Sequence, residues 1–120
     1  MNAAARLRIV VITFSGLAVL GLACTAHAEC AFPRAPASIP DGKTATEQEM
    51  LAATTAFKTY NEEVNAFGGC LDQETRSRSV GTAQLMQFKT IQSKKLTAAV
   101  DELKEQARRL NEQVRAFKSR

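Results

Sequence analysis

Apolar residues recur every three or four positions along two separate stretches of the chain. In the first stretch the spacing is 3, 4, 3, 4, 3, 4, and in the second it is 4, 3, 4, 3, 4, 3. The first set is Met50, Ala53, Phe57, Tyr60, Val64, Phe67 and Leu71, and the second is Leu96, Val100, Leu103, Ala107, Leu110, Val114 and Phe117. Because an α-helix repeats every 3.6 residues, each set forms one apolar line, here called a seam, along one side of a long helix.

A polar segment without apolar periodicity, residues 75–82, separates the two seams and holds a glycine, which predicts a loop. We therefore expect helix one at about 44–74 and helix two at about 83–118. A short connection between two long helices makes them antiparallel neighbours. The predicted fold is all-α, with residues 44–120 forming an antiparallel, coiled-coil-like hairpin.

The regular pattern is interrupted once in each predicted helix. Gly68–Gly69 would cost about 1 kcal/mol per residue in a helix interior, so helix one either ends at Phe67 or continues in weakened form. Leu71 keeps the seam, which favours a continuous helix. In helix two the first half contains an extra step of four, and Gln92 stands where an apolar residue is expected.

Residues 29–43 form a proline-rich segment, here called the arm. Pro33, Pro36 and Pro40 disfavour helix and push their preceding residues toward extended geometry. Asp41–Gly42 then provides a turn. Two overlapping capping boxes could start helix one, and they are Thr44 with Glu47 and Thr46 with Glu49.

The arm has the reach to fold back along helix one. From Cys30 to Lys43 an extended chain covers roughly 40 Å, and the helix from Thr44 to Cys70 is also roughly 39 Å long. We therefore expect an intramolecular Cys30–Cys70 disulfide, with packing contacts from Phe32 and Ile39. A floppy linker and an intermolecular disulfide are the alternatives.

The first 28 residues have the pattern of a signal peptide. Arg6 and Arg8 precede an apolar stretch at 9–23, and Ala26–Ala28 forms a small-residue cleavage site. Cleavage between Ala28 and Glu29 would export the rest of the chain to the periplasm or the exterior. A transmembrane anchor and a lipoprotein acylated at Cys24 are the alternatives.

Cleavage at this site would leave little catalytic chemistry. It removes Cys24 and His27, which is the one histidine of the chain. The two cysteines that remain predict a disulfide in an oxidising compartment. Without histidine the usual nucleophile pairs and zinc sites cannot form. Tyr60 lies on a seam and reads as a core residue. We expect no enzyme, no catalytic residue, no metal and no cofactor.

The two predicted helices differ in charge. Residues 44–75 carry six carboxylates against one lysine, whereas residues 76–120 carry eleven basic and four acidic residues. Opposite charges favour pairing of the two helices. We prefer this explanation of the basic second helix to the alternative that it forms a patch for anionic lipid. After cleavage the excess of basic residues is small, so we expect no nucleic-acid partner. No second apolar run remains after cleavage, so we expect no membrane contact.

Val80, Met86 and Ile91 lie partly off the seam of helix two. A small chain with one seam buries little surface, so a homodimer forming a four-helix bundle is an open alternative. An unidentified envelope protein is the other expected partner.

Several features together resemble small uncharacterised exported proteins of Proteobacteria. These are Cys30 near Pro33 and Pro36, Ile39 to Gly42, Ala45–Thr46, Met50, Tyr60, Cys70–Leu71, Glu74 and Asn111 to Lys118. The resemblance implies a periplasmic α-helical protein and no mechanism. We expect a non-catalytic structural or interaction module of the cell envelope, with a chaperone-like binding protein or a tethered lipoprotein as alternatives.

Overall fold

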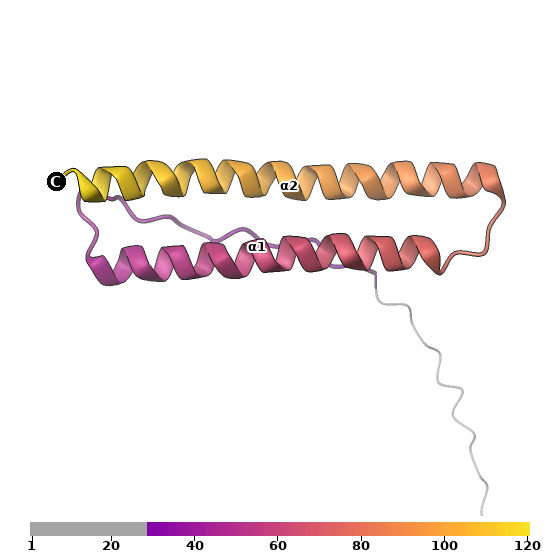
Figure 1. Cartoon of the computed structure of the whole chain (residues 1–120), viewed down its shortest axis with the longest axis horizontal. Helices are drawn as coiled ribbons and strands as arrows, with labels where there is room; N and C mark the ends of the chain where they lie inside the picture. The colour runs from indigo at the N-terminus through magenta and orange to yellow at the C-terminus, as the bar shows by residue number, and fades with distance from the viewer. Residues whose placement is uncertain (1–28) are drawn as a thin grey trace, which may run out of the picture.

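The computed structural model describes residues 29–120, and this part of the chain contains two helices and no strand. Helix α1 spans Glu47–Arg76 and helix α2 spans Thr82–Lys118. They lie side by side and antiparallel, joined by a loop at residues 77–81 (Figure 1). The prediction of an all-α chain with a helical hairpin is therefore confirmed, and each helix end lies within a few residues of its expected position.

Helix α1 begins with the second of the two overlapping capping boxes. The hydroxyl of Thr46 accepts a hydrogen bond from the Glu49 backbone N–H at 3.2 Å, and the Glu49 carboxylate accepts one from the Thr46 N–H at 2.7 Å. The Thr44 box does not form because the backbone N–H groups of Thr44 and Ala45 donate to the Asp41 carbonyl in a preceding turn. The first backbone N–H groups of α1 therefore find hydrogen-bond acceptors within a few residues.

Helix α1 is continuous through Gly68–Gly69, as the seam at Leu71 had favoured. A Cβ at Gly68 would lie 3.3 Å from a terminal methyl carbon of Leu96, a tight contact, whereas a Cβ at Gly69 would meet nothing within 4 Å. Gly68 therefore lets α2 approach α1 closely, while Gly69 weakens the helix without a packing gain.

The seam of α1 forms the centre of the core. Five of its seven residues are buried, namely Met50, Tyr60, Val64, Phe67 and Leu71, while Ala53 and Phe57 are partly exposed. Together with Ala99 of α2, the last four of the buried residues make one hydrophobic cluster. Burying a side chain of this size stabilises the fold by about 1.5–3 kcal/mol. The seam predicted for α1 is therefore the surface that organises the hairpin.

The predicted seam of α2 is displaced from the line that is most deeply buried. Of its seven residues only Leu110 is buried, and the others are partly exposed. The other buried residues of α2 are Gln92, Ala99 and Gln106, which are spaced by seven and therefore follow one line along the helix. Leu96, Val100 and Leu103 pack against the hydrophobic cluster, so the predicted seam faces the core without being its most deeply buried line. Besides α1, a further segment contacts α2.

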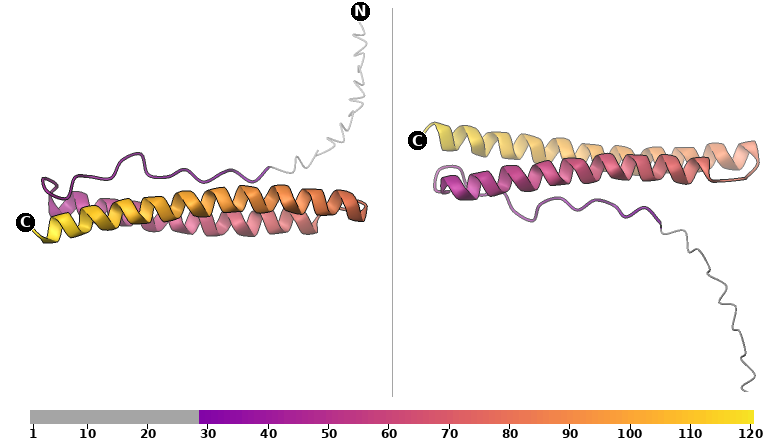
Figure 2. Two further views of the ribbon diagram at one scale, coloured as in Figure 1. Left: turned by 90° about the horizontal axis from the view of Figure 1, so that it is seen from above. Right: turned by 60° about the horizontal axis from the view of Figure 1, so that its bottom comes forward.

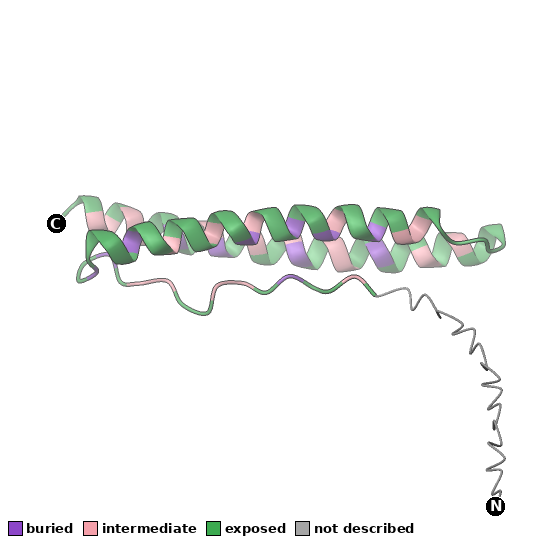
Figure 3. Cartoon of the chain, turned by 90° about the horizontal axis from the view of Figure 1, so that it is seen from below, coloured by how far each residue is buried: buried purple, intermediate pink, exposed green. Residues whose placement is uncertain are grey.

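The additional neighbour is the arm. It runs along one face of the hairpin and returns to α1 through a tight turn (Figures 1 and 2). Cys30 and Ala35 of the arm pack against the hydrophobic cluster, and Pro33 is buried. Figure 3 shows the buried positions gathered where the two helices and the arm meet. The core is therefore enclosed by three segments, of which one has no regular secondary structure.

Candidate functional site

A disulfide ties the arm to the outer side of α1. Cys30 and Cys70 are bonded, with their Cα atoms 5.9 Å apart. Next to this bond the Phe32 ring meets the Phe67 ring edge-on, with centroids 5.4 Å apart. In the chain-entropy model a loop of this size contributes about 4 kcal/mol. The expected Cys30–Cys70 disulfide agrees with the structure, and a disulfide is consistent with an oxidising compartment.

The start of the arm is also bonded to both helices by polar groups. The Glu74 carboxylate accepts a hydrogen bond from the Cys30 backbone N–H at 3.2 Å and another from the side-chain amide of Gln92. Lys95 forms an ion pair with Glu29 at 3.1 Å. Glu74 therefore joins the arm to α1 and α2, although the sequence analysis assigned no such role to it.

The end of the arm is held against the last turns of α2. The Gly42 backbone N–H donates to the side-chain carbonyl of Gln113 at 2.9 Å. A Cβ at Gly42 would lie 1.9 Å from the Gln113 backbone oxygen, so no larger residue fits at this distance. The guanidinium of Arg120 donates to the Ala45 carbonyl at 2.7 Å. The arm is thus fixed at both ends, which a floppy linker would not be.

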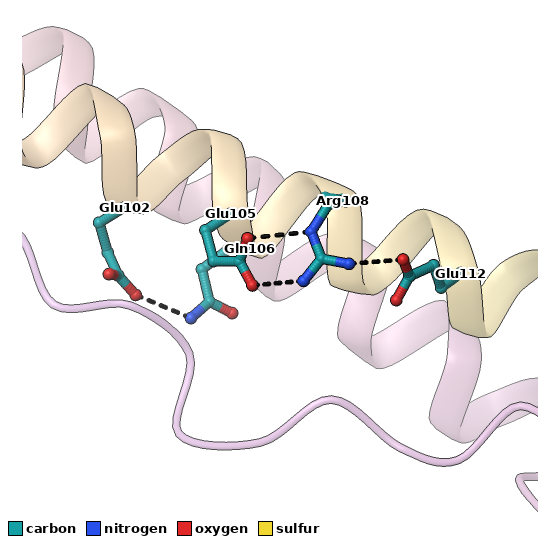
Figure 4. Close-up of polar contacts among 5 residues, drawn as sticks. All are labelled: Glu102, Glu105, Gln106, Arg108 and Glu112. Carbon is teal, nitrogen blue, oxygen red and sulfur yellow. Dashed lines mark hydrogen bonds and ion pairs between the residues drawn. The ribbon is translucent and has the colours of Figure 1, made fainter.

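Three glutamines of α2, Gln92, Gln106 and Gln113, lie on one line along the helix, and the arm bonds the last of them. Gln92 and Gln106 are buried, and Gln113 follows seven residues later. Gln106 donates to Glu102, one turn earlier on the same helix, at 2.9 Å (Figure 4). These glutamines are fourteen and seven residues apart, which was a signal in the sequence, but polar residues are not counted in an apolar pattern.

No ion pair within residues 29–120 joins α1 to α2. Arg108 bonds Glu105 and Glu112 on its own helix, as Figure 4 shows, and Arg76 pairs with Asp72 within α1. The hydrogen bonds from Arg108 lower the pKa of Glu105. The opposite charges of the two helices are therefore not matched by direct contact, and each helix presents its own charge to the solvent.

Tyr60 is the deepest large side chain of the core. It is 2 % exposed, and its hydroxyl has no hydrogen-bond partner among residues 29–120. Burial raises its pKa, and the negative charges of Glu102 and Glu63 raise it further. The phenol therefore stays protonated at neutral pH, which matches its assignment as a core residue.

The other expected sites fall partly outside the described residues. Cys24 and Ala28 lie in residues 1–28, so acylation and cleavage stay predictions, and Glu29 is the first described residue. Within residues 29–120 no three His, Cys, Asp or Glu side chains gather as a metal site would require. Neither of the two described helices is apolar enough over a sufficient length to cross a membrane.

Besides Leu51 of α1, which is 66 % exposed, large apolar side chains are exposed at two places in the described residues. Val80, Met86 and Ile91, at the loop end of the hairpin, are 43 %, 60 % and 53 % exposed. Beside the disulfide, Phe32 is 49 % exposed and lines an open groove with Ala66 and Phe67. These two surfaces are the described candidates for contact with another molecule.

No protein-family model, curated protein or solved structure matches this chain. The resemblance to small exported proteins of Proteobacteria therefore stays an expectation. The function has to be argued from the disulfide, the arm and the exposed surfaces.

Proposed function

We propose that this chain is an exported, non-catalytic interaction module of the bacterial envelope. The observation that carries the proposal is the Cys30–Cys70 disulfide, which closes the arm over the hairpin. Such a bond persists in the periplasm or outside the cell, where thiols are not kept reduced. The signal-peptide pattern in residues 1–28 points to the same compartment.

The elongated hairpin is suited to act as a rigid rod that offers binding surfaces along its length. The two helices form a coiled-coil-like hairpin, and the arm clasp, residues 29–43 with the Cys30–Cys70 bond, stiffens one face of it. A chain of this size has a small core, and such staples offset that weakness. Most of the outer surface of both helices stays free for a partner.

The first test is the intact mass of the protein taken from the envelope, measured with and without reductant. We expect a chain that starts at Glu29 and becomes heavier by two hydrogens on reduction. A lipidated chain starting at Cys24 would instead make the protein a tethered lipoprotein. An uncleaved chain with free thiols, or a disulfide-linked dimer, would contradict the proposal.

The second test looks for a defined envelope partner. A photo-crosslinking residue is placed at Glu62 on the exposed side of α1 and, separately, at Arg109 on the exposed side of α2. We expect one adduct of discrete mass from one of the two faces. The matched control carries the same crosslinker with Cys30→Ser and Cys70→Ser, and it should lose that adduct. No adduct from either face would count against an interaction module.

A chaperone-like role is a second candidate, and the exposed ring of Phe32 favours it. This ring and its neighbours Ala66 and Phe67 form an open apolar groove that could hold unfolded segments. The purified protein should then suppress aggregation of an unfolded envelope protein, and Phe32→Ser should reduce that effect. An inactive wild-type protein in this assay would remove the candidate.

A further inference from the structure

The Cys30–Cys70 disulfide can be reached from solvent on the Cys70 side. Cys70 is exposed, whereas Cys30 is half-buried and packs against the hydrophobic cluster. Cys70 also lines the open groove beside the bond, together with the exposed ring of Phe32. Arg34 and Glu63 line the same groove, so a cation and an anion balance each other there. A thiolate that enters this groove meets Cys70 before it meets Cys30.

Between its two ends the arm is held by packing and not by hydrogen bonds. Residues 31–40 make no hydrogen bond to either helix within the described part of the chain. Pro33 is the one buried residue of this segment, and Ala35 packs against the hydrophobic cluster. The backbone of an extended, proline-rich segment is bonded by water and not by its own groups. The arm can therefore leave the hairpin without breaking a ladder of hydrogen bonds.

All members of the hydrophobic cluster come from the two helices, which are joined by their own loop. The start of the arm has two polar ties to them. One is the hydrogen bond from the Cys30 N–H to Glu74, and the other is the ion pair of Lys95 with Glu29, whose side chains are 37 % and 79 % exposed. An exposed ion pair contributes little to stability. The disulfide is therefore the strongest tie at this end, and its loss leaves the contacts between the helices in place.

We propose that the Cys30–Cys70 bond is a redox switch, which a dithiol opens by attack on the Cys70 sulfur to release the arm while both helices stay folded. The arm then pivots about the turn at Asp41–Gly42, where it remains joined to α1. Its release uncovers the side of Phe67 that meets the Phe32 ring. The apolar surface available to a partner is therefore larger in the reduced form. This switch goes beyond the proposed function, which needs only that the bond forms.

The exchange proceeds in two steps. A thiolate of the dithiol forms a bond to the Cys70 sulfur, the Cys30–Cys70 bond breaks, and Cys30 leaves as a thiolate. The second thiolate of the dithiol then attacks its own partner sulfur in this mixed disulfide and displaces Cys70 as a thiolate. The two protons that the dithiol loses end on Cys30 and Cys70. The dithiol becomes a disulfide, and the two electrons that it gives up reduce the Cys30–Cys70 bond.

The first experiment opens the bond in the folded protein. The oxidised protein is purified from the envelope, and its free thiols are blocked with iodoacetamide, so that a chain which retains Cys24 has only the disulfide left to react. Dithiothreitol, a small dithiol, is then added without denaturant, and the new thiols are blocked in the same way. The intact mass before reduction tests export and the disulfide separately, so a failed release is distinguishable from failure of the proposed function.

Three signals follow the release. The nuclear Overhauser effect between the Phe32 and Phe67 rings, whose centroids lie 5.4 Å apart in the closed form, should disappear. The helical signal in circular dichroism should stay within about a tenth of its starting value, because only the arm detaches. The fluorescence of anilinonaphthalene sulfonate, which binds exposed apolar surface, should rise at least about threefold. A bond that dithiothreitol does not open, a ring contact that survives reduction, or melting of the helices would each overturn the proposal.

Reduced glutathione, a monothiol, shows which sulfur is attacked. It is mixed briefly with the oxidised protein, the free thiols are trapped with N-ethylmaleimide, and both cysteines are mapped by mass spectrometry. Glutathione should be found on Cys70 and the maleimide on Cys30, with the reverse pattern at least about tenfold rarer. Glutathione found mainly on Cys30, or equally on both, would overturn the assignment of Cys70.

A variant of Phe32 distinguishes release of the arm from reduction of the bond alone. The protein is equilibrated with a fixed ratio of reduced to oxidised dithiothreitol, and the ratio of opened to closed molecules is read by mass after the thiols are blocked. In Phe32→Ser this ratio should rise about fivefold, because the closed form loses a ring contact that the released arm does not make. If the arm stayed docked after reduction, both forms would lose the contact and the ratio would not change.

Leu51→Ser is the matched control. It removes an apolar side chain of α1 that is 66 % exposed and does not line the groove beside the disulfide. The ratio of opened to closed molecules should stay within about twofold of the wild type. Equal shifts in the two variants, or no shift in Phe32→Ser, would overturn the proposal.

Discussion

Gly42 of the arm and Gln113 of α2 are joined by a hydrogen bond of 2.9 Å and are too close to admit a side chain between them. The backbone dihedral φ of Gly42 is not positive, so space and not backbone conformation requires a glycine here. At this point the extended arm touches the backbone of a helix directly. This contact holds one end of the arm on α2, and the disulfide holds Cys30 at the other end on α1. The two together fix the register of the arm along the hairpin.

Replacing Gly42 by alanine should therefore destabilise the fold. The added Cβ would lie 1.9 Å from the Gln113 oxygen, so either the arm or α2 must move. We expect the free energy of unfolding to fall by about 1–3 kcal/mol. Denaturant unfolding followed by circular dichroism measures this change.

Gly69→Ala is the matched control. It adds the same methyl group in α1, where nothing lies within 4 Å of the new Cβ, and it should stabilise the protein by up to about 1 kcal/mol. Equal effects of the two substitutions would show that the arm does not contact α2 as described.

The helices and the disulfide were predictable because local patterns determine them. An apolar residue at every third or fourth position identifies both helices, and the capping box at Thr46 marks the start of α1. The disulfide followed from two lengths, since the arm and the helix cover nearly the same distance. Apolar spacing, a capping box and segment lengths do not depend on how the segments pack.

The buried line of α2 and the role of Glu74 were not predictable in this way. Gln92 and Gln106 are buried polar residues, which an apolar pattern does not count, and the arm has no periodicity that would show which face it meets. Glu74 bonds both the arm and Gln92, a tertiary arrangement that leaves no local trace. The opposite charges of the two helices were visible in the sequence, but no ion pair joins α1 to α2 within the described residues.

Replacing Glu74 by alanine should destabilise the start of the arm. The substitution leaves the Cys30 N–H and the amide of buried Gln92 without their acceptor. We expect a loss of about 1–3 kcal/mol in the free energy of unfolding, with faster hydrogen exchange at Cys30. Asp72→Ala, which breaks an exposed ion pair in the same helix, should cost less than about 1 kcal/mol. If both variants lose the same stability, Glu74 does not anchor the arm.

The capping box should make the start of α1 sensitive to acid. The hydrogen bond from the Thr46 backbone, followed by that from its hydroxyl, lowers the pKa of Glu49. The folded pKa is below the unfolded value, so the box stabilises α1 above the unfolded pKa of about 4.3 and loses its effect as pH falls through the folded pKa. A proton titration by nuclear magnetic resonance should show a low midpoint for Glu49 in the wild type and a higher one in Thr46→Ala, which keeps the bond from the backbone N–H and loses the bond from the hydroxyl. An ordinary midpoint in the wild type would exclude the box in solution.

Tyr60 should make the fold sensitive to alkali, and its hydroxyl should contribute nothing to stability. Burial raises its pKa above 10, so the neutral phenol stabilises the folded state below the unfolded pKa and this stability is lost as pH rises through the folded value. Tyr60 is the single tyrosine of the chain, so tyrosinate absorbance reports on it alone. The absorbance should rise only above pH 10, together with loss of helix.

The matched substitution is Tyr60→Phe, which removes a buried hydroxyl that has no partner and leaves the ring in place. Because no hydrogen bond is lost, we expect stability at neutral pH to stay within about 1 kcal/mol of the wild type or to rise. Tyr60→Ala, which empties the site, should cost about 3–5 kcal/mol. If Tyr60→Phe lost as much stability as Tyr60→Ala, the hydroxyl would have to be hydrogen-bonded in solution. The arm and helices around Tyr60 would then be arranged differently from the structure described here.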